Sequence, residues 1–427
     1  MKPKEKALKF PKGFLWGSST SAYQVEGGII NEWSEWEKKN AGRLAGQAKN
    51  YWQPWQIKKF PEILNRENYI CGRACDHYNK YKEDFDLLSE FGHNAHRLSL
   101  EWSRIEPRPG EFDDKELAHY KEVILDLKKR GIEPFITISH WTNPVWIAAI
   151  GGWENKESIA YFSGYVKKVA EEYKDLVKFW QPINEPGTYI GLSYIQGSFP
   201  PQVKSFWQAN KAFKNIMESY RQSYNIIHGI IKEAQVGMSH YAVYNVPYKN
   251  KLKNKIILKP IDYIRNWRFL DSIKNHFDFI GIQYYHTDVL NLKFGLGRWG
   301  PIETKNPNRI VSDLGWDIFP RGIYYLLKKA SKYEKPIYIT ENGLADRDDK
   351  KREWFIKRHL YWVHRAIHEG VDVRGFFYWS LLDNFEWDKG FWPRFGLVAV
   401  DYKTLERKIR PSAWKYAEIC KKNKIIL

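Results

Sequence analysis

Strand-like and helix-like segments alternate along most of this chain, and this alternation limits its fold more than any other feature. Short apolar runs are followed by longer segments with apolar residues at helical spacing. The predicted strands are residues 14–17, 95–100, 134–139, 177–180, 236–239, 277–285, 337–340 and 373–379, and the predicted helices between them are 78–91, 117–129, 158–173, 207–232, 322–331 and 354–368. Strands that alternate with helices in this way are parallel and joined by right-handed connections. Eight of them predict an α/β fold, a closed (β/α)8 TIM barrel in which residues 1–427 form a single domain with extended loops after the strands.

One alternative architecture and one unusual segment need separate treatment. An open doubly wound sheet that binds a dinucleotide would need a glycine-rich phosphate loop after the first strand, and this sequence has none there. Residues 31–73 do not follow the alternation; they are weakly periodic and rich in tryptophan, with Trp33, Trp36, Trp52 and Trp55. We therefore expect residues 31–73 to form an irregular rim or lid within the barrel domain.

The formal net charge of +18 raises the question of a polyanionic partner. Basic patches attract nucleic acids and anionic membranes through long-range fields and counterion release. The basic residues here are dispersed and mixed with acidic ones, which indicates a solvated surface with no specific nucleic-acid or membrane partner. Residues 248–255 are the most concentrated exception, and we expect an exposed loop there, with weak non-specific anion binding as the alternative.

The cysteines and the start of the chain bear on the compartment. Cys71, Cys75 and Cys420 are too few for a disulfide framework, which favours a reducing environment. The basic first residues are not followed by the apolar segment of a signal peptide, and no uncharged apolar run is long enough to span a bilayer. We therefore expect a cytoplasmic protein. Cys71, Cys75 and His77 lack a second ligand pair, so we expect no metal site.

Two carboxylates stand at the ends of predicted strands. Glu341 follows the alternating run Ile337–Thr340 and precedes a glycine turn, whereas Glu185 follows a short apolar run and is stopped by Pro186. Because the carboxyl ends of barrel strands surround one mouth, we expect the two acids to converge. Paired carboxylates are the working groups of glycoside hydrolysis, in which a retaining enzyme uses one as nucleophile and the other as acid and base.

Other polar and aromatic residues share these strand ends. They are Gln24, Arg97, His140, Trp141, Asn184, Tyr285, Trp379 and the loop 382–387. We expect Arg97 and Tyr285 to donate hydrogen bonds to Glu341 and to keep its pKa low. Glu185 has fewer cationic neighbours, so we expect its carboxyl to stay protonated near neutral pH. Asn184 is placed to bind the 2-hydroxyl group of a sugar.

These residues occur in segments that resemble glycoside hydrolase family 1, the β-glycosidases, over residues 10–425. The segments are 14–17, 23–27, 97–105, 140–141, 184–186, 284–285, 340–343 and 378–387; one alone is a weak signal, but all of them in this order are highly specific. The resemblance implies Glu185 as acid and base and Glu341 as nucleophile. It also implies hydroxyl contacts from Gln24, His140, Asn184, Glu386 and Trp387, a stacking floor from Trp379, and Trp316 toward the leaving group. Trp141 and Phe395 are further candidates for substrate binding.

Departures from the family pattern bear on the choice of sugar. Gln283 stands where the family usually has Asn, which leaves its contact with the site open, and Ser139 and His96 replace residues that are usually aromatic. Members that act on 6-phosphoglycosides generally replace the glutamate that matches Glu386. Glu386 is retained here, and a carboxylate repels a phosphate, which favours unphosphorylated sugars.

The sequence thus predicts a retaining β-glucosidase that needs no cofactor. Its substrates would be small β-glucosides or short oligosaccharides, with β-galactosides or β-fucosides as side substrates. One alternative is a transglycosidase of the same mechanism, in which an acceptor sugar or alcohol replaces water. Another is a non-catalytic carbohydrate-binding barrel, but pseudoenzymes of this fold lose one of the two glutamates, and this chain keeps both. Both a monomer and a homo-oligomer are compatible with the sequence.

Overall fold

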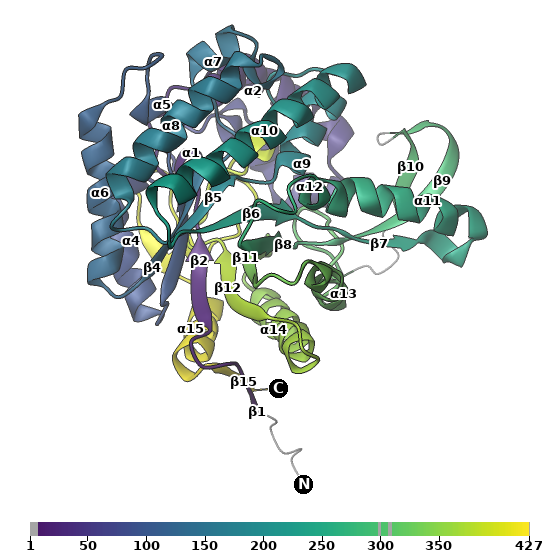
Figure 1. The fold of residues 1–427 in the computed structure, drawn as a ribbon. Coiled ribbons are helices and arrows are strands. Elements are labelled where there is room, and N and C mark those ends of the chain that lie inside the picture. Colours follow the sequence, from purple (N-terminus) through teal and green to yellow (C-terminus); the bar gives the residue numbers. More distant parts are fainter. Residues whose placement is uncertain (1–6, 298–299, 306–309, 427) are drawn as a thin grey trace.

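The structure, a computed structural model, describes residues 7–297, 300–305 and 310–426 (Figure 1). Within these ranges, eight parallel strands close into a barrel in the order β11-β12-β2-β3-β4-β5-β6-β8, which confirms the predicted (β/α)8 fold. The strands are β2 (Leu15–Ser19), β3 (Ala95–Ser99), β4 (Glu133–Ser139), β5 (Phe179–Ile183), β6 (Gln235–Tyr241), β8 (Phe279–Gln283), β11 (Ile337–Gly343) and β12 (Val373–Trp379). Residues 1–6, the basic segment in which we expect no signal peptide, lie outside the described ranges.

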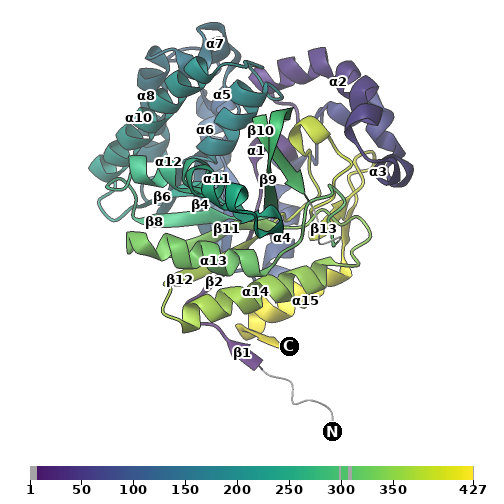
Figure 2. The same ribbon diagram turned by 90° about the vertical axis from the view of Figure 1, so that its right-hand side faces the viewer.

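Helices surround the barrel as the alternation predicted (Figures 1 and 2). The longer ones are α4 (His77–Glu90), α6 (Asp114–Lys129), α8 (Glu157–Tyr173), α10 (Phe206–Ile230), α13 (Arg321–Ala330), α14 (Arg352–His368) and α15 (Pro411–Lys422). Short helices lie in the loops: α1 (Ala22–Val25), α3 (Pro54–Lys59), α5 (Trp102–Ile105), α7 (Val145–Ala149), α9 (Pro186–Ile190) and α12 (Arg268–Ser272). Side-chain caps start two of the long helices, because Asp113 accepts from the N–H of Lys115 over 2.8 Å and Ser205 from that of Gln208 over 3.4 Å.

The barrel interior changes from apolar to polar toward the carboxyl ends of the strands. Phe135, Phe179, Phe279, Tyr338 and Phe377 form a buried aromatic cluster, in which Phe135 and Phe179 stack with ring centroids 4.1 Å apart. Inward-facing residues recur every second position along a strand, so the positions two and four residues further along these strands lie above this cluster. Gln181 in β5, two residues after Phe179, and Gln283 in β8, four residues after Phe279, occupy such positions. They form a polar layer between the apolar core and the mouth of the barrel.

The expectation of an irregular segment at residues 31–73 is wrong. Residues Glu32–Tyr51 form α2, a helix of 20 residues at the upper right of Figure 2. Asn31 and Ser34 form a reciprocal cap, with hydrogen bonds of 2.9 and 3.0 Å between each side chain and the other's backbone N–H. Most of the helix surface is polar, which hid the helical period, although Trp33, Glu37, Ala41 and Ala48 are buried along one face.

A small second sheet extends from the barrel between β6 and β11. It consists of β7 (Tyr244–Pro247), β9 (Thr287–Gly297) and β10 (Gly300–Lys305) and packs beside α11 (Leu252–Asp262). The expectation of an exposed loop at 248–255 is therefore only partly right, because a helical turn spans Tyr248–Asn250 and α11 begins at Leu252. The alternation of charged and apolar residues in this stretch concealed a helix whose inner face packs on the small sheet.

Two further strand pairs hold the loop after β12 and the ends of the described chain. β13 (Val398–Val400) pairs with β14 (Arg407–Ile409), and β1 (Ala7–Lys9) pairs with β15 (Lys424–Ile426), both antiparallel. Figure 1 accordingly shows β1 and β15 next to each other below the barrel. No helix in the described ranges has both the length and the apolar character needed to cross a bilayer.

Candidate active site

The carboxyl ends of the barrel strands surround a cavity of about 1090 Å³. The predicted site residues that line it are Gln24, His140, Trp141, Asn184, Glu185, Tyr285, Trp316, Glu341, Trp379, Glu386, Trp387 and Phe395. The remaining predicted residue, Arg97, lies on β3 and is fully buried. The structure therefore brings all of these residues to one end of the barrel, since the register of the parallel strands aligns their ends.

Three side chains donate hydrogen bonds to Glu341 on β11. Arg97 and Gln283 donate to Oε1, the glutamine over 2.8 Å, and Tyr285 donates to Oε2. Burial raises the pKa of Glu341, and Arg97 and Tyr285 oppose this rise without cancelling it. The predicted donors are thus in place, but the expectation that they keep the pKa of Glu341 low is wrong, because desolvation outweighs them.

Glu185 is the second residue after β5 and directly precedes α9. Its backbone has a left-handed conformation, with φ of 39°, and its N–H donates to the carbonyl oxygen of Ser239 on β6 over 3.0 Å. Such a conformation is unfavourable for a side chain other than glycine and is typical of functional sites. Burial and then the charge of Glu341 raise the pKa of Glu185 well above its ordinary value. This direction agrees with the expectation that Glu185 holds a proton near neutral pH.

Two of the predicted site residues in the cavity wall carry a buried polar atom with no hydrogen-bond partner among the described residues: Nδ1 of His140 and Oε2 of Glu386. Burial and the nearby charge of Arg97 hold the pKa of His140 well below its ordinary value, so its ring is neutral. Burial raises the pKa of Glu386 to about 8. A buried polar atom without a partner costs about 1–3 kcal/mol, so a ligand that supplies hydroxyl groups would be stabilised here.

Aromatic rings form much of the wall. The ring of His140 is nearly parallel to Trp379 and Trp387, with interplanar angles of 19° and 11°. Elsewhere in the wall Tyr285 meets Trp316 and Phe395 edge-on, with centroids 5.9 and 6.1 Å away. Such faces offer large apolar contact areas beside the polar groups.

The rim helix α2 supports this wall from behind. Trp33 packs edge-on against Trp387, with ring centroids 4.7 Å apart, and Tyr23 stacks on the same ring at 5.8 Å. Trp387 itself has a left-handed backbone, with φ of 50°. The tryptophans of the predicted rim are thus divided between two places, because Trp33 and Trp36 are buried behind the wall while Trp52 and Trp55 line the cavity.

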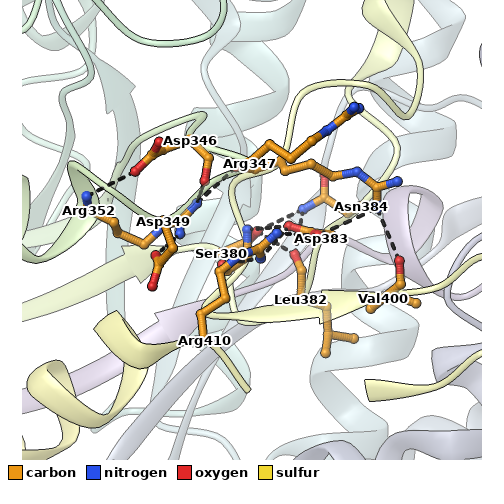
Figure 3. Close-up of polar contacts among 12 residues, drawn as sticks. Asp346, Arg347, Asp349, Arg352, Ser380, Leu382, Asp383, Asn384, Val400 and Arg410 are labelled. Carbon is orange, nitrogen blue, oxygen red and sulfur yellow. Dashed lines mark hydrogen bonds and ion pairs between the residues drawn. The ribbon is translucent and has the colours of Figure 1, made fainter. Parts of the chain in front are cut away.

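A buried ion-pair network holds the loop after β12, which carries Glu386 and Trp387 (Figure 3). Arg410 donates to Asp383 through both Nη atoms over 2.9 Å, and the N–H of Gly396 donates over 2.9 Å. Arg394 lies 3.5 Å from the same carboxylate. Burial raises the pKa of Asp383, but the two arginines outweigh it and leave the pKa below its ordinary value.

The same loop is hydrogen-bonded to α1, the short helix that follows the first barrel strand, β2. Gln24 donates from Nε2 to the carbonyl oxygen of Phe385 over 2.8 Å and to Oδ1 of Asn384 over 3.1 Å. Asn384 in turn donates to Oγ of Ser380 over 2.9 Å (Figure 3). These bonds fix the loop that presents Glu386 to the cavity.

Comparison with known proteins agrees with this geometry. The family model for glycosyl hydrolase family 1 matches residues 6–271 and 268–425. The chain belongs to this family. β-Glucosidase A of Thermotoga maritima is 31% identical over 457 aligned residues, which cover 97% of this chain and 98% of that protein.

Solved structures of family 1 proteins share the whole fold. A β-glycosidase from Pyrococcus horikoshii superimposes with a TM-score of 0.87 at 35% identity, covering 98% of this chain and 96% of the other. A β-glucosidase from Thermotoga maritima in complex with glucoimidazole superimposes with a TM-score of 0.85 at 28% identity, covering 97% and 99%. The barrel and its loops therefore correspond to those of family 1 along nearly their full length.

Two glutamines of this family 1 site were missing from the predicted site residues. Nε2 of Gln283 donates both to Glu341 and, over 2.9 Å, to Oδ1 of Asn184, which settles the contact that the sequence left open. Gln181 accepts from Nε of Arg97 over 2.7 Å. The sequence did contain a signal for both, because side chains at every second position of a strand share one face. Gln283 precedes Tyr285 by two residues, and Gln181 precedes Glu185 by four.

The described residues contain no group of three or more His, Cys, Asp or Glu side chains suited to hold a metal ion. The thiols of Cys71 and Cys75 donate to the carbonyl oxygens of Tyr23 and Asp383, over 3.2 and 2.9 Å. These two cysteines thus take part in the packing behind the cavity wall.

Proposed function

We propose that Glu341 is the nucleophile and Glu185 the acid and base of this retaining β-glycosidase. The observation that carries the proposal is that both carboxyls line one buried cavity and that the charge of Glu341 helps to raise the pKa of Glu185. Two neighbouring acids whose environments separate their pKa values supply one carboxylate and one proton donor at the same pH. Arg97 and Tyr285 donate to Glu341, and these two hydrogen bonds support the ionised role for Glu341.

The reaction then proceeds in two displacements. Glu341 attacks the anomeric carbon while the bond to the leaving oxygen breaks and Glu185 gives its proton to that oxygen, which produces a covalent glycosyl ester. In the second step Glu185, now a carboxylate, takes a proton from water as the water oxygen attacks the same carbon and releases Glu341. Two inversions leave the anomeric configuration unchanged.

We assign the recognition of the nonreducing sugar to the polar side chains of the wall. These are Gln24, His140, Asn184 and Glu386 with Trp387, while Trp379 provides the stacking floor, Trp316 faces the leaving group, and Trp141 and Phe395 are further substrate contacts; all of them line the cavity. The free Nδ1 of His140 and Oε2 of Glu386 support hydroxyl binding. Relatives named β-glucosidase favour glucosides, with galactosides and fucosides as side substrates, and the carboxylate of Glu386 disfavours a 6-phosphate.

We also infer that residues 7–426 act as one catalytic domain and that the protein works in the cytoplasm. The pairing of β1 with β15 and the closure of one barrel by strands from Leu15 to Trp379 support a single unit. Cys71, Cys75 and Cys420 are unpaired and buried, which suits a reducing compartment.

Turnover on a panel of nitrophenyl β-glycosides tests the reaction, with proton NMR following the anomer that is released first. We expect the glucoside to be hydrolysed and the β-anomer to appear before mutarotation. Early α-product would contradict the retaining mechanism, and a panel that favours another sugar would overturn the glucoside assignment alone.

Replacing the nucleophile tests the assignment of Glu341. Glu341→Gly should abolish hydrolysis of ordinary β-glucosides, because no covalent ester can form. The variant should regain transfer when it receives an α-glucosyl fluoride, which resembles the intermediate, together with an acceptor alcohol. If Glu341→Gly still hydrolysed the nitrophenyl glucoside at the wild-type rate, another residue would have to be the nucleophile.

A further inference from the structure

The helix α11 and the residue that follows it present a stripe of largely exposed apolar side chains. Leu252 and Ile256 are 73% and 66% exposed, and Tyr263, which follows the helix, is 47% exposed. Their spacing of four and seven residues places them on one side of the helix. Large apolar side chains that line up on one exposed face mark an interaction surface more often than isolated ones do.

The opposite face anchors this helix, so its outer stripe is not needed for folding. Asn254 is buried and donates from Nδ2 to the carbonyl oxygen of Tyr248 over 2.8 Å. Asn266, further along, donates to the carbonyl oxygen of Val243 over 2.8 Å and to Oδ1 of Asp262 over 2.8 Å. The helix is thus fixed on the small sheet with its outer side turned to the solvent, at the right of Figure 1 and facing the viewer in Figure 2.

Basic side chains flank the stripe. Residues 249–268 contain five lysines, two arginines and a single acid, Asp262, which gives a local charge of +6 (7 − 1). Lys251, Lys255 and Lys259 are exposed, and Asp262 is engaged by Lys329 over 2.8 Å. The stripe is therefore an apolar strip within a positively charged surface.

A second exposed apolar element lies at the same side of the cavity mouth. Phe206 and Trp207, at the start of α10, are 80% and 86% exposed. Phe206 and Ile264 line the same cavity, and Arg268 at the start of α12 donates to Asn210 of α10 over 3.4 Å, so the start of α10 lies beside the segment that follows α11. Exposed aromatic side chains at this place suit the boundary between water and lipid.

We propose that α11 and the start of α10 dock on an anionic lipid surface. A helix that lies in a membrane interface combines apolar side chains, which enter the acyl boundary, with lysines that contact anionic head groups. Both features occur together on α11, where Leu252 and Ile256 are flanked by exposed lysines. A nucleic acid would pair with the lysines but would gain nothing from Leu252, Ile256 and Trp207, so the apolar stripe favours a bilayer.

Docking of this kind differs from membrane spanning, for which no helix in the described ranges is long and apolar enough. It also gives the basic stretch 248–255 a partner that the dispersed charge of the whole chain did not indicate. Because Ile261 and Ile264 border the cavity, the docked enzyme would hold its mouth next to the lipid surface. The inference is independent of the assignment of Glu185 and Glu341.

Flotation with vesicles tests the proposal on the full chain. Wild-type protein should bind vesicles of phosphatidylcholine mixed with phosphatidylglycerol, and bind vesicles of phosphatidylcholine alone at least about tenfold more weakly. The triple variant Leu252→Ser, Ile256→Ser, Trp207→Ser should lose at least about tenfold in the partition coefficient. The charge variant Lys251→Glu, Lys255→Glu, Lys259→Glu should lose at least as much, and binding by the wild type should weaken with salt.

A matched control carries Glu in place of Lys115, Lys128 and Lys129, which are exposed on α6 at the far side of the barrel (Figure 1). It changes the net charge equally and should bind as the wild type does. All variants should keep wild-type turnover of a soluble nitrophenyl glucoside, since none alters a residue assigned to catalysis. Absence of wild-type binding, equal loss in the control, or retention by the serine variant would overturn the proposal. So would a dimer that the serine variant dissociates without any vesicle binding, because a second copy would then cover the stripe.

Discussion

Two buried carboxylates in this protein, each paired with an arginine, have pKa values shifted in opposite directions. Asp383 receives both Nη atoms of Arg410 and lies near Arg394, and its pKa is lowered in spite of burial. Glu341 receives a hydrogen bond from Arg97, yet burial leaves its pKa raised. Both acids are almost completely buried, so desolvation alone does not distinguish them.

The difference lies in how each guanidinium group is shared. Arg97 divides its N–H groups among Glu341, Gln181 over 2.7 Å, Asn184 over 2.7 Å and Ser239 over 3.3 Å. Arg410 instead directs both Nη atoms at a single carboxylate and shares only Nη1, with the carbonyl oxygen of Gly396 over 2.7 Å, and a second arginine, Arg394, assists it. A fully compensated acid is a structural anchor, whereas an incompletely compensated acid beside a second carboxyl is poised to react.

Removing the carboxylate of the anchor should have the largest effect on stability. Asp383→Asn leaves Arg410 buried without its ionic partner, so we expect the free energy of unfolding at neutral pH to fall by about 3–5 kcal/mol. Urea unfolding followed by circular dichroism measures the change. The folded-state pKa of Asp383 is depressed, so the wild type loses this contribution as the pH falls from about 3.9 through that pKa, and the two proteins should converge there.

An exposed pair provides the control for this anchor. Arg374 donates to Asp372 over 2.7 Å, but both side chains are about half exposed, at 54% and 51%. Asp372→Asn should change the free energy of unfolding by no more than about 1 kcal/mol. If both variants lost the same amount, burial would not be what makes the Asp383 pair strong, and the comparison would fail.

Much of this contrast could be predicted from the sequence, because the strand ends and motifs identified Arg97, Tyr285 and both glutamates. The eight strands also follow from the alternation, since buried parallel strands are short apolar runs that helical segments separate. The sign of the pKa shift at Glu341 could not be predicted, because it depends on how many acceptors share Arg97. That number is set by Gln181 and Ser239, which stand on neighbouring strands and carry no motif.

The segments that sequence reasoning missed are those in which tertiary contacts outweigh local pattern. In α2 only Trp33, Ser34, Trp36, Glu37, Ala41 and Ala48 are buried, so the apolar signal over 20 residues is thin. In α11 the exposed face carries apolar residues while Asn254 is buried, which reverses the usual pattern. Both helices lie at the cavity mouth, where a surface that contacts a ligand or a partner need not follow the rules of a core.

Removing one of the hydrogen bonds that Glu341 accepts should increase the difference between Glu341 and Asp383. Tyr285→Phe keeps the ring packed against Trp316 and Phe395 but removes the hydroxyl that donates to Glu341. The pKa of Glu341 should then rise further, so the ascending limb of kcat/KM against pH should move to higher pH, and kcat/KM at neutral pH should fall by about 10- to 100-fold. Tyr241→Phe is the matched control, because the Tyr241 hydroxyl bonds His286 and should leave that limb in place. A limb that moves equally in both variants would show that Tyr285 does not act through Glu341.

The smallest effect should come from Glu185, and its sign should be opposite to that at Asp383. The folded-state pKa of Glu185 is raised, so the native protein binds a proton more tightly than the unfolded chain does. Stability therefore falls as the pH rises from about 4.3 through that pKa, and the loss persists above it.

Glu185→Gln has no charge at any pH and removes this loss, so it should gain on the order of 1 kcal/mol at neutral pH while losing activity. Urea midpoints at neutral pH and at about pH 3 measure the gain, which should vanish at the lower pH, where Glu185 is protonated in nearly all folded and unfolded molecules. A loss at neutral pH, or a gain that is independent of pH, would mean that Glu185 is a compensated acid like Asp383, and catalysis would then need another source of its proton.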